Sequence, residues 1–297
     1  MRWSRRRFLA VATASAALAG CSAGGSPGRA ARGQEDEDVP TYHYGDHPAQ
    51  FAELSLPSGA SVVPVVVIVH GGFWRDAYGA ELGRPLARDL VNRGWAALNV
   101  EYRRVGPNAQ AGGGGWPTTC LDVAAAVDGL AVQGQRIASG RLDLSRVVAL
   151  GHSAGGHLAG WLASRARQEP GAPGADPQVT LSGAVLQAGV VDLEGGFAED
   201  LGAGAVAAFM GGSPQDLPDA YAQASPIARV PLRVPTLCVH GRADDVVPIS
   251  QSEAFVAAAL KAGDTSELQA FDGDHSDVVD TEGEGWELCV EAHERLL

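Results

Sequence analysis

Several kinds of residue are scarce in this sequence, and each shortage argues against a class of protein. Only four of the 297 residues are cysteine, too few for a disulfide scaffold in a chain of this length. Basic residues number 22 against 35 acidic ones, and the formal net charge of -13 argues against a nucleic-acid-binding protein, which would need a basic face. After the first 20 residues, no apolar run reaches the roughly 18 residues needed to span a bilayer.

What remains is typical of a globular protein. Aromatic residues make up only 6% of the chain, but 45% of it is hydrophobic. Valine, leucine and isoleucine recur in tight clusters, which a disordered chain would not show. The length is sufficient for one large core or two small ones.

The N-terminus is typical of an export signal. Residues 4–9, Ser-Arg-Arg-Arg-Phe-Leu, resemble the twin-arginine consensus of Tat-type export, and an apolar stretch follows from Phe8 to Ala19. Residues 18–21, Leu-Ala-Gly-Cys, resemble the lipobox of bacterial lipoproteins, in which the cysteine is acylated. We therefore predict a Tat-type lipoprotein signal peptide over residues 1–20 and a lipid anchor on Cys21. The alternative is an ordinary cleaved signal with a chance cysteine, which would make the protein secreted.

Residues 21–40 are predicted to be a flexible tether between this anchor and the domain. They contain glycine, serine, alanine and proline, then the acidic run Glu35–Asp38, with no apolar periodicity. A charged loop packed on the domain is the alternative. In this interpretation the protein is an outward-facing lipoprotein of the cell membrane, and the membrane is contacted only through the lipid.

From residue 41 to residue 297 the pattern predicts one α/β domain. Strand-like apolar runs alternate with helix-like segments, and this alternation predicts a mostly parallel sheet covered by helices on both faces. The expected strands are 62–70, 95–102, 147–150, 181–188, 234–240 and 268–271. The expected helices are 83–93, from 119 onward, 154–167, 250–263 and 286–297, with capping boxes at Thr119/Asp122 and Ser250/Glu253. The Gly- and Pro-rich segment 192–231 interrupts the alternation, and we expect at most a small cap there.

The pentapeptide Gly151–Gly155, Gly-His-Ser-Ala-Gly, matches the G-x-S-x-G motif. The motif requires a sharp turn from a strand into a helix, which the predicted elements supply. Glycines two residues before and after Ser153 relieve crowding, and the helix N-terminus favours developing negative charge. Ser153 is therefore the predicted nucleophile.

A serine nucleophile needs a base and an acid that orients the base. Four histidines follow Ser153. His157 lies in the nucleophile's own helix, His240 ends a strand and is interpreted as structural, and His293 is expected on the solvent face of the last helix. His275 stands in a polar loop after the last strand, where the base belongs. The acid should lie on the loop after the preceding strand, where both Asp244 and Asp245 are available.

An acyl-transfer site also needs backbone N–H groups that meet the developing oxyanion. One donor should be Ala154, directly after the nucleophile. The other should come from residues 70–74, His-Gly-Gly-Phe-Trp, after an early strand. Gly72 and Phe73 are the candidates, and the sequence does not choose between them.

With these motifs, residues 60–290 resemble esterases of the α/β-hydrolase superfamily. The nearest branches are the kynurenine-formamidase-like and feruloyl-esterase-like enzymes, with the hormone-sensitive-lipase-like enzymes related to them. The residues that carry the resemblance are 70–74, Tyr102, Arg103, Pro117, Asp122 and 151–157. Phe73 stands where hormone-sensitive-lipase-like enzymes usually have a third glycine, which favours the other two branches. Residues 240–248 resemble the pattern H-G-x-x-D-x-x-V-P, which assigns the acid to Asp244.

The resemblance implies an α/β-hydrolase fold and a serine hydrolase that cleaves short-chain or aryl carboxylic esters through an acyl-enzyme. An amide hydrolase with the same triad is the alternative, and a non-catalytic binding lipoprotein is a third possibility that the intact triad argues against. We expect a small-molecule ester or amide as substrate and no nucleic acid. The sequence has no metal-ligand spacing and no dinucleotide fingerprint, so no metal and no cofactor are predicted.

Overall fold

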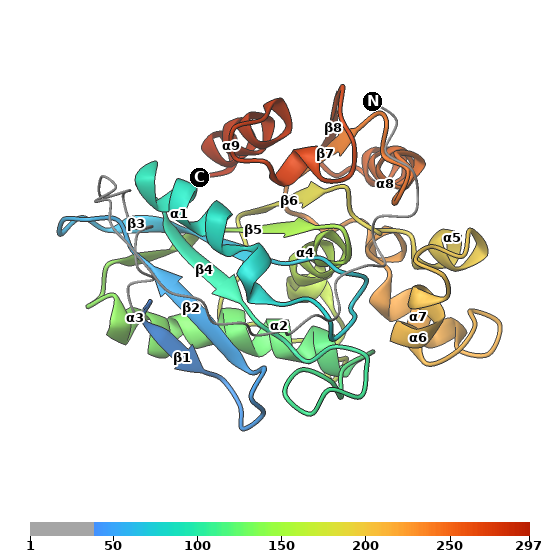
Figure 1. Cartoon of the computed structure of the whole chain (residues 1–297), viewed down its shortest axis with the longest axis horizontal. Helices are drawn as coiled ribbons and strands as arrows, with labels where there is room; N and C mark the ends of the chain where they lie inside the picture. The colour runs from blue at the N-terminus through green and yellow to red at the C-terminus, as the bar shows by residue number, and fades with distance from the viewer. Residues whose placement is uncertain (1–38) are drawn as a thin grey trace, which may run out of the picture. The chain divides into compact units, whose positions relative to one another are not determined.

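The computed structural model describes residues 39–297, in which eight strands form one sheet (Figure 1). The strands are β1 (Thr41–His43), β2 (Phe51–Ser55), β3 (Val63–Val69), β4 (Ala96–Val100), β5 (Leu142–His152), β6 (Gly183–Gln187), β7 (Thr236–Gly241) and β8 (Ser266–Phe271). Their order is β1-β2-β4-β3-β5-β6-β7-β8. The pairs β1–β2 and β2–β4 are antiparallel and the others are parallel, as the expected fold class requires.

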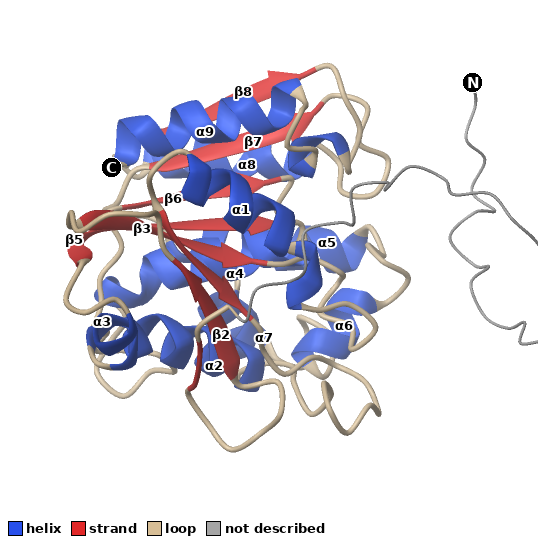
Figure 2. Ribbon diagram, turned by 60° about the vertical axis from the view of Figure 1, so that its left-hand side comes forward, coloured by secondary structure: helices blue, strands red, loops and turns tan. Residues whose placement is uncertain are grey.

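Helices cover both faces of this sheet (Figure 2). Helices α1 (Arg84–Asn92) and α9 (Glu284–Leu296) pack on one face, where Leu86 and Trp286 meet Ile68 and Leu150. Helices α2 (Thr118–Asp128), α4 (Ala154–Ser164) and α8 (Ser250–Lys261) pack on the other face. A short helix, α3 (Gln133–Ile137), precedes β5.

The central strands are buried on both faces because they are apolar at nearly every position. All seven residues of β3 are buried, and alternate side chains enter the two cores: Val65, Val67 and Val69 face one, Val66 and Ile68 the other. An unbroken Val- and Ile-rich run suits a parallel strand between two helical layers. This pattern is why β3 could be predicted from the sequence.

Three expectations about local structure were wrong. Thr119 does not cap α2: its hydroxyl donates to the Arg103 carbonyl and accepts from the Gly115 N–H. Ser250 lies inside α8, whose N-cap is Ile249. His293 is fully buried rather than solvent-facing, because it lies on the face of α9 that packs on the sheet.

The segment between β6 and β7 forms a small cap of three short helices. These are α5 (Leu193–Ala198), α6 (Ala205–Met210) and α7 (Pro218–Ala224). Figures 1 and 2 show them gathered at one side of the sheet. The N–H of Trp116 donates to the Phe209 carbonyl (2.8 Å), and Phe209 stacks on Trp74, so the cap is attached to the loops after β3 and β4.

The predicted signal peptide, the lipidation site Cys21 and residues 21–38 of the predicted tether lie outside the described residues. Within residues 39–297, no helix has the length and apolar character needed to cross a membrane.

Candidate active site

Ser153 occupies the tight turn between β5 and α4. Its backbone angles are φ 57° and ψ -119°, a region that residues other than glycine rarely adopt. Three hydrogen bonds hold it there: its N–H donates to the Gln187 carbonyl (2.8 Å), and its carbonyl accepts from Val190 (3.3 Å) and His157 (3.2 Å). Three parts of the chain therefore hold the strained turn: strand β6, the segment that follows β6, and helix α4.

The two glycines of the motif are required by backbone packing. A Cβ atom on Gly151 would overlap the carbonyl of Gly155, and a Cβ atom on Gly155 would overlap the carbonyl of Val69. The first overlap would force α4 away from β5, and the second would force α4 away from β3. Only glycine at both positions lets the helix begin directly behind the serine.

Asp244 and His275 meet at the ends of the two following strands. The Nδ1 of His275, after β8, donates to Oδ2 of Asp244, after β7, at 2.7 Å. The Asp244 side chain is fully buried, and its Oδ1 accepts the N–H groups of Val246 (2.9 Å) and Val247 (2.8 Å). Asp245, the alternative acid, is exposed.

His240 provides a second contact to Asp244. Its Nε2 lies 3.2 Å from Oδ2 of Asp244 and 2.9 Å from the Val247 carbonyl, both of which are acceptors. Nε2 therefore carries the proton, and Nδ1 accepts from the Ser252 hydroxyl at 2.8 Å. Burial raises the pKa of Asp244, but hydrogen bonds from His240 and His275 and the charge of His275 outweigh burial and hold the pKa below its usual value. The carboxylate is ionised at neutral pH.

The loop after β3 runs against the nucleophile. Gly72, Phe73 and Trp74 all have positive φ (109°, 50° and 54°), so the loop bends sharply directly after Gly71, which packs against His152 and Ser153. Among the hydrogen bonds of the described residues, none uses the N–H of Gly72, Phe73 or Ala154 as donor. The N–H of Ala154, at the helix N-terminus directly after Ser153, and those of Gly72 and Phe73 thus have no hydrogen-bond acceptor among the described residues.

A buried polar cluster supports the base of this loop. The hydroxyl of Tyr102 donates to the His70 carbonyl (2.7 Å), and the two rings stack with centroids 4.3 Å apart. The Nε2 of His70 lies 3.3 Å from Glu101, whose carboxylate also pairs with Arg104. His70 and Tyr102 thus hold the loop, a role that their sequence motif did not specify.

Trp74 connects the same loop to the nucleophile helix and the cap. Its Nε1–H donates to Nδ1 of His157 at 3.2 Å, and Nε2 of His157 donates to the Ala224 carbonyl at 3.0 Å. The indole stacks on Phe209 with centroids 4.5 Å apart. Trp74 is fully buried, so it is a packing residue rather than part of a substrate pocket.

His152, the residue before the nucleophile, contacts the loop that carries His275. Its Nε2 donates to the backbone carbonyl of His275 at 2.9 Å, and the two rings lie 4.6 Å apart. Burial lowers the pKa of His152 to about 3, with a further contribution from the charge of His275, so the ring is neutral. His152 was not predicted as a site residue, although strand alternation from Val148 and Leu150 places it on the face of the sheet that α1 and α9 cover.

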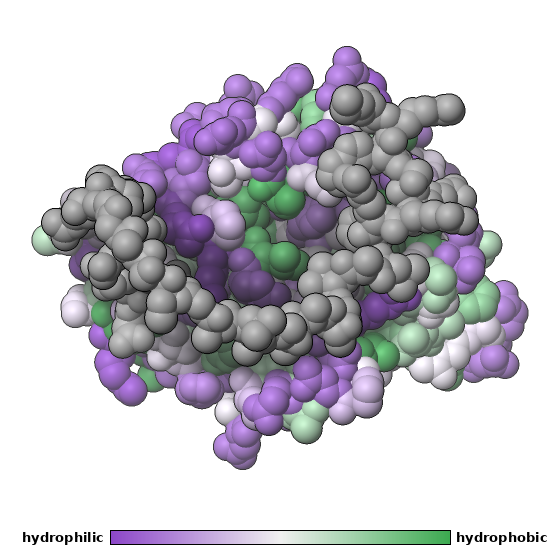
Figure 3. Space-filling model, viewed as in Figure 1, coloured by the Kyte–Doolittle hydropathy of each residue, from purple (hydrophilic) through white to green (hydrophobic). Residues whose placement is uncertain are grey.

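A cavity of about 200 Å³ lies beside His152, and we call it the α1 cavity. It is lined by Ile68, Val69, His70, Gly71, Leu82, Gly83, Leu86, His152, Gln187, Ser276 and Val279. Figure 3 shows hydrophobic residues inside a hollow, bordered by polar ones, on the face where α1 lies in Figure 1.

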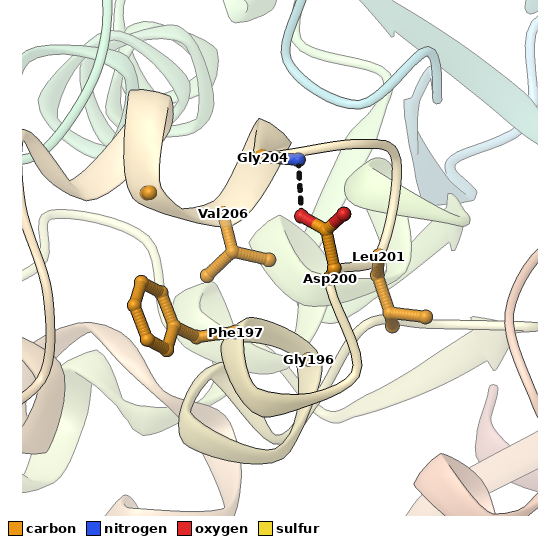
Figure 4. Close-up of a pocket in the computed structure, with 7 residues that line it drawn as sticks. Gly196, Phe197, Asp200, Leu201, Gly204 and Val206 are labelled. Carbon is orange, nitrogen blue, oxygen red and sulfur yellow. Dashed lines mark hydrogen bonds between the residues drawn. The ribbon is translucent and has the colours of Figure 1, made fainter.

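A second cavity, of about 100 Å³, lies between α5 and α6 (Figure 4). Its one carboxylate, Asp200, accepts the N–H of Gly204 at 2.8 Å. Its lining holds no serine, cysteine or histidine, so we interpret it as a feature of the cap. Elsewhere in residues 39–297, Cys120, Cys238 and Cys289 are free and buried, and no cluster of three metal-ligating side chains occurs.

This arrangement defines an α/β-hydrolase. The sheet has the strand order given above, the serine turn follows β5, and the loops that carry the acid and the histidine follow β7 and β8. A family model described as BD-FAE matches residues 53–259, and the chain belongs to this family. The resemblance to α/β-hydrolase-type esterases is thereby confirmed.

Curated relatives include two esterases of Mycobacterium tuberculosis. The chain is 29% identical to Esterase LipC over 231 residues, which is 72% of this chain and 53% of LipC. It is 32% identical to Esterase LipQ over 208 residues, which is 67% of this chain and 46% of LipQ. The chain thus spans about half the length of these relatives.

Solved structures share the fold. The butyrate-bound Est2 esterase of Thermogutta terrifontis matches with a TM-score of 0.67 at 21% identity, over 89% of this chain and 94% of that chain. An acetyl ester-xyloside bifunctional hydrolase of Caldicellulosiruptor lactoaceticus matches with a TM-score of 0.65 at 25% identity, over 83% and 88%.

Proposed function

We propose that this protein is a serine esterase that cleaves carboxylic esters through an acyl-enzyme. The observation that carries the proposal is the 2.7 Å hydrogen bond from His275 to the buried Asp244, at the same edge of the sheet as the strained turn of Ser153. Membership of the BD-FAE family and similarity to LipC and LipQ support ester substrates.

In this proposal Ser153 Oγ attacks the ester carbonyl carbon. Asp244 is an acceptor and holds the proton of His275 on Nδ1, so Nε2 has the lone pair that takes the proton of Ser153. The negative charge on the carbonyl oxygen is met by the N–H of Ala154 and by that of Gly72 or Phe73. His275 then returns the proton to the departing alcohol.

Water completes the cycle on the acyl-enzyme. His275 takes a proton from the attacking water. The second tetrahedral intermediate then collapses by cleavage of the bond from the acyl carbon to Ser153 Oγ, and His275 returns the proton to Oγ as the carboxylic acid leaves. Asp244 remains ionised throughout and stabilises the imidazolium each time it forms.

A fluorophosphonate probe and a pair of chromogenic substrates test the proposal. An activated serine beside oxyanion donors reacts with the probe, so the folded protein should be labelled and the Ser153→Ala variant should not. A p-nitrophenyl ester and the matching p-nitroanilide, assayed side by side, should show much faster hydrolysis of the ester. A folded wild-type protein that is not labelled would refute the serine-hydrolase function, and faster hydrolysis of the anilide would identify an amidase.

We further propose that the enzyme is exported and anchored through lipid on Cys21. The support is the order of twin arginines, apolar stretch and lipobox in residues 4–21. Multiple acyl chains on one cysteine would provide firm anchoring, which a single chain does not. Mass spectrometry of the mature N-terminus should detect an acylated Cys21, whereas an unmodified N-terminus beyond residue 21 would indicate simple secretion.

A further inference from the structure

We propose that the cap positions the loop that supplies the oxyanion donor. The inference rests on the proposed esterase function and adds positioning residues to the same site. The part of the cap concerned is the segment between α5 and α6, residues 199–204, which we call the cap loop. It contacts the loop after β3 at two points, and both contacts fall on Gly202.

The loop after β3 needs support because its turn is strained. The N–H of Arg75 donates to the Gly72 carbonyl at 3.0 Å, which closes a β-turn with Phe73 and Trp74 at its centre. Both central residues have positive φ (50° and 54°), a conformation that such turns usually reserve for glycine, asparagine or aspartate. A phenylalanine and a tryptophan keep this conformation only where surrounding contacts hold it.

Trp74 is held by the stacking and the hydrogen bond described above, whereas Phe73 is held by the cap loop. A Cβ atom on Gly202 would stand 2.6 to 2.8 Å from three atoms of the Phe73 ring, so the ring lies directly against the Gly202 backbone. The guanidinium of Arg75 donates to the Gly202 carbonyl, and its Cζ lies 5.8 Å from the centroid of the Phe73 ring. Gly202 thus touches Phe73 and also holds Arg75, the residue that closes the turn.

The cap loop can serve as a support because its own hydrogen bonds fold it. The N–H of Leu201 donates to the Gly196 carbonyl at 3.0 Å, and the N–H of Ala203 donates to the Asp200 carbonyl at 3.0 Å. The carboxylate of Asp200 accepts the N–H of Gly204 at 2.8 Å (Figure 4). The side chain of Leu201 is buried in the core. The cap loop therefore offers the strained turn a fixed surface.

The strained turn begins directly beside the nucleophile. A Cβ atom on Gly71 would stand 3.1 Å from the Cβ of Ser153, so the backbone at Gly71 packs against the serine. The next two residues, Gly72 and Phe73, carry the candidate oxyanion N–H groups, which have no acceptor among the described residues. The position of these N–H groups depends on the turn, and through Phe73 it depends on the cap loop.

Two glycines of the cap loop give a matched pair of variants. Gly202 and Gly204 both have positive φ (64° and 79°), so alanine is strained at either position. At Gly202 the new Cβ meets the Phe73 ring, whereas at Gly204 nothing lies within 4 Å. Gly202→Ala should lower kcat about 10- to 100-fold with KM changed less than about threefold. Gly204→Ala should change kcat less than about twofold.

Two further readouts separate positioning from a loss of folded protein, with active sites counted by the fluorophosphonate probe. A trifluoromethyl ketone forms a tetrahedral oxyanion adduct with the serine, so it should inhibit Gly202→Ala less strongly, by the factor that is lost in kcat/KM. In a Phe73→Ala background, which lacks the ring but keeps the backbone N–H, adding Gly202→Ala should change kcat less than about twofold.

Arg75→Met tests the second contact without introducing an overlap, and it decides the question if Gly202→Ala does not fold. It loses the hydrogen bond to the Gly202 carbonyl and should lower kcat about three- to tenfold with little change in KM. Arg75→Lys keeps a donor and should recover part of the loss. The control is Arg136→Met, which removes an exposed arginine of α3, on the opposite side of the domain from the cap (Figures 1 and 2), and should keep kcat.

Equal kcat in Gly202→Ala and Gly204→Ala, whether both fall or neither does, would overturn the positioning role and leave the esterase function intact. A loss that persists in the Phe73→Ala background would also overturn it, as would wild-type kcat in Arg75→Met where Gly202→Ala does not fold. A wild-type protein that hydrolyses no ester and resists the fluorophosphonate probe would overturn the proposed function, and the positioning role with it.

Discussion

The imidazole of His152 donates a hydrogen bond to the backbone carbonyl of His275 across 123 positions of sequence. The bond joins the strand that ends at the nucleophile to the loop that carries the proposed base. Because the acceptor is a backbone atom, it constrains the position of the His275 main chain, while Asp244 constrains the orientation of its ring.

We therefore expect His152 to be a positioning residue. His152→Phe keeps a ring of similar shape but removes the donor, and should lower kcat about 10- to 100-fold with little change in KM. His152→Gln retains an N–H donor and should recover part of the loss. The control is His293→Phe, a buried histidine of α9 remote from the site, which should keep kcat. A lower kcat in His293→Phe, or equal losses in the Phe and Gln variants of His152, would argue against this role.

Asp244 and Asp245 should differ sharply on substitution. Asp244→Asn removes the charge that stabilises the imidazolium and should lower kcat on the order of 10⁴-fold, or about 5 kcal/mol of barrier. Asp245→Asn alters an exposed carboxylate and should change kcat less than about tenfold. Both variants are measured on one ester at saturating substrate after folding is confirmed by circular dichroism. The reverse order would assign the acid to Asp245.

Trp74 and Trp161 offer a matched pair for testing the loop that approaches Ser153. Trp74→Phe removes the N–H that His157 accepts and leaves a buried nitrogen without a donor, at an expected cost of about 1–3 kcal/mol on top of packing losses. Trp161 is equally buried, and its Nε1 has no partner among the described residues, so Trp161→Phe loses packing only.

Urea unfolding and kcat, measured on both variants, separate stability from loop position. Only Trp74→Phe should lower kcat, because only Trp74 belongs to the loop that supplies the proposed oxyanion donor. If both variants lose kcat alike, the hydrogen bond to His157 does not position that loop.

Stability should fall as the solution becomes acidic. Burial lowers the pKa of His70 and His152 to about 3 and of His157 and His293 to about 4, against 6.5 in an unfolded chain. Unfolding therefore takes up protons below pH 6.5, and each histidine removes stability as the pH falls toward its folded pKa.

The slope approaches about 1.4 kcal/mol per pH unit for each histidine. Urea unfolding at about pH 7 and about pH 5 measures the total slope. His293→Phe removes one of these four histidines and should reduce the slope by the contribution of that histidine. The Nε2 atom of His293 is buried without a partner among the described residues, so the ring is neutral in the folded state. An unchanged slope in this variant would mean that His293 is not neutral in the folded state.

The sequence predicted the central strands and the turn at Ser153 because their signals are local. A dense Val and Ile run specifies β3, and two glycines specify the turn after β5. The edge strand β1 and its neighbour β2 were not predicted, because they are only three and five residues long.

Contacts that depend on the orientation of a side chain also could not be predicted from the sequence. His152, His157 and Glu101 take part in the site through bonds to residues 123, 83 and 31 positions away. The expectation that His293 faces solvent was wrong. Helical periodicity divides α9 into two faces, but it does not show which of the two packs on the sheet. The assignment of the acid to Asp244 came mainly from a resemblance, because the shorter route from the strand end to His275 favours Asp244 over Asp245 only in part.

The proposed base stands on a loop that follows β8, a strand paired only to β7, at the edge of the sheet. Edge strands open more easily than central ones, since half of their neighbours are missing. Mild denaturant that detaches β8 would carry His275 away from Ser153 while β3, β5 and their helices stay folded. Loss of hydrolysis would then come before loss of helical signal, so an enzymatic assay would report on the integrity of this one edge sooner than spectroscopy reports on the whole domain.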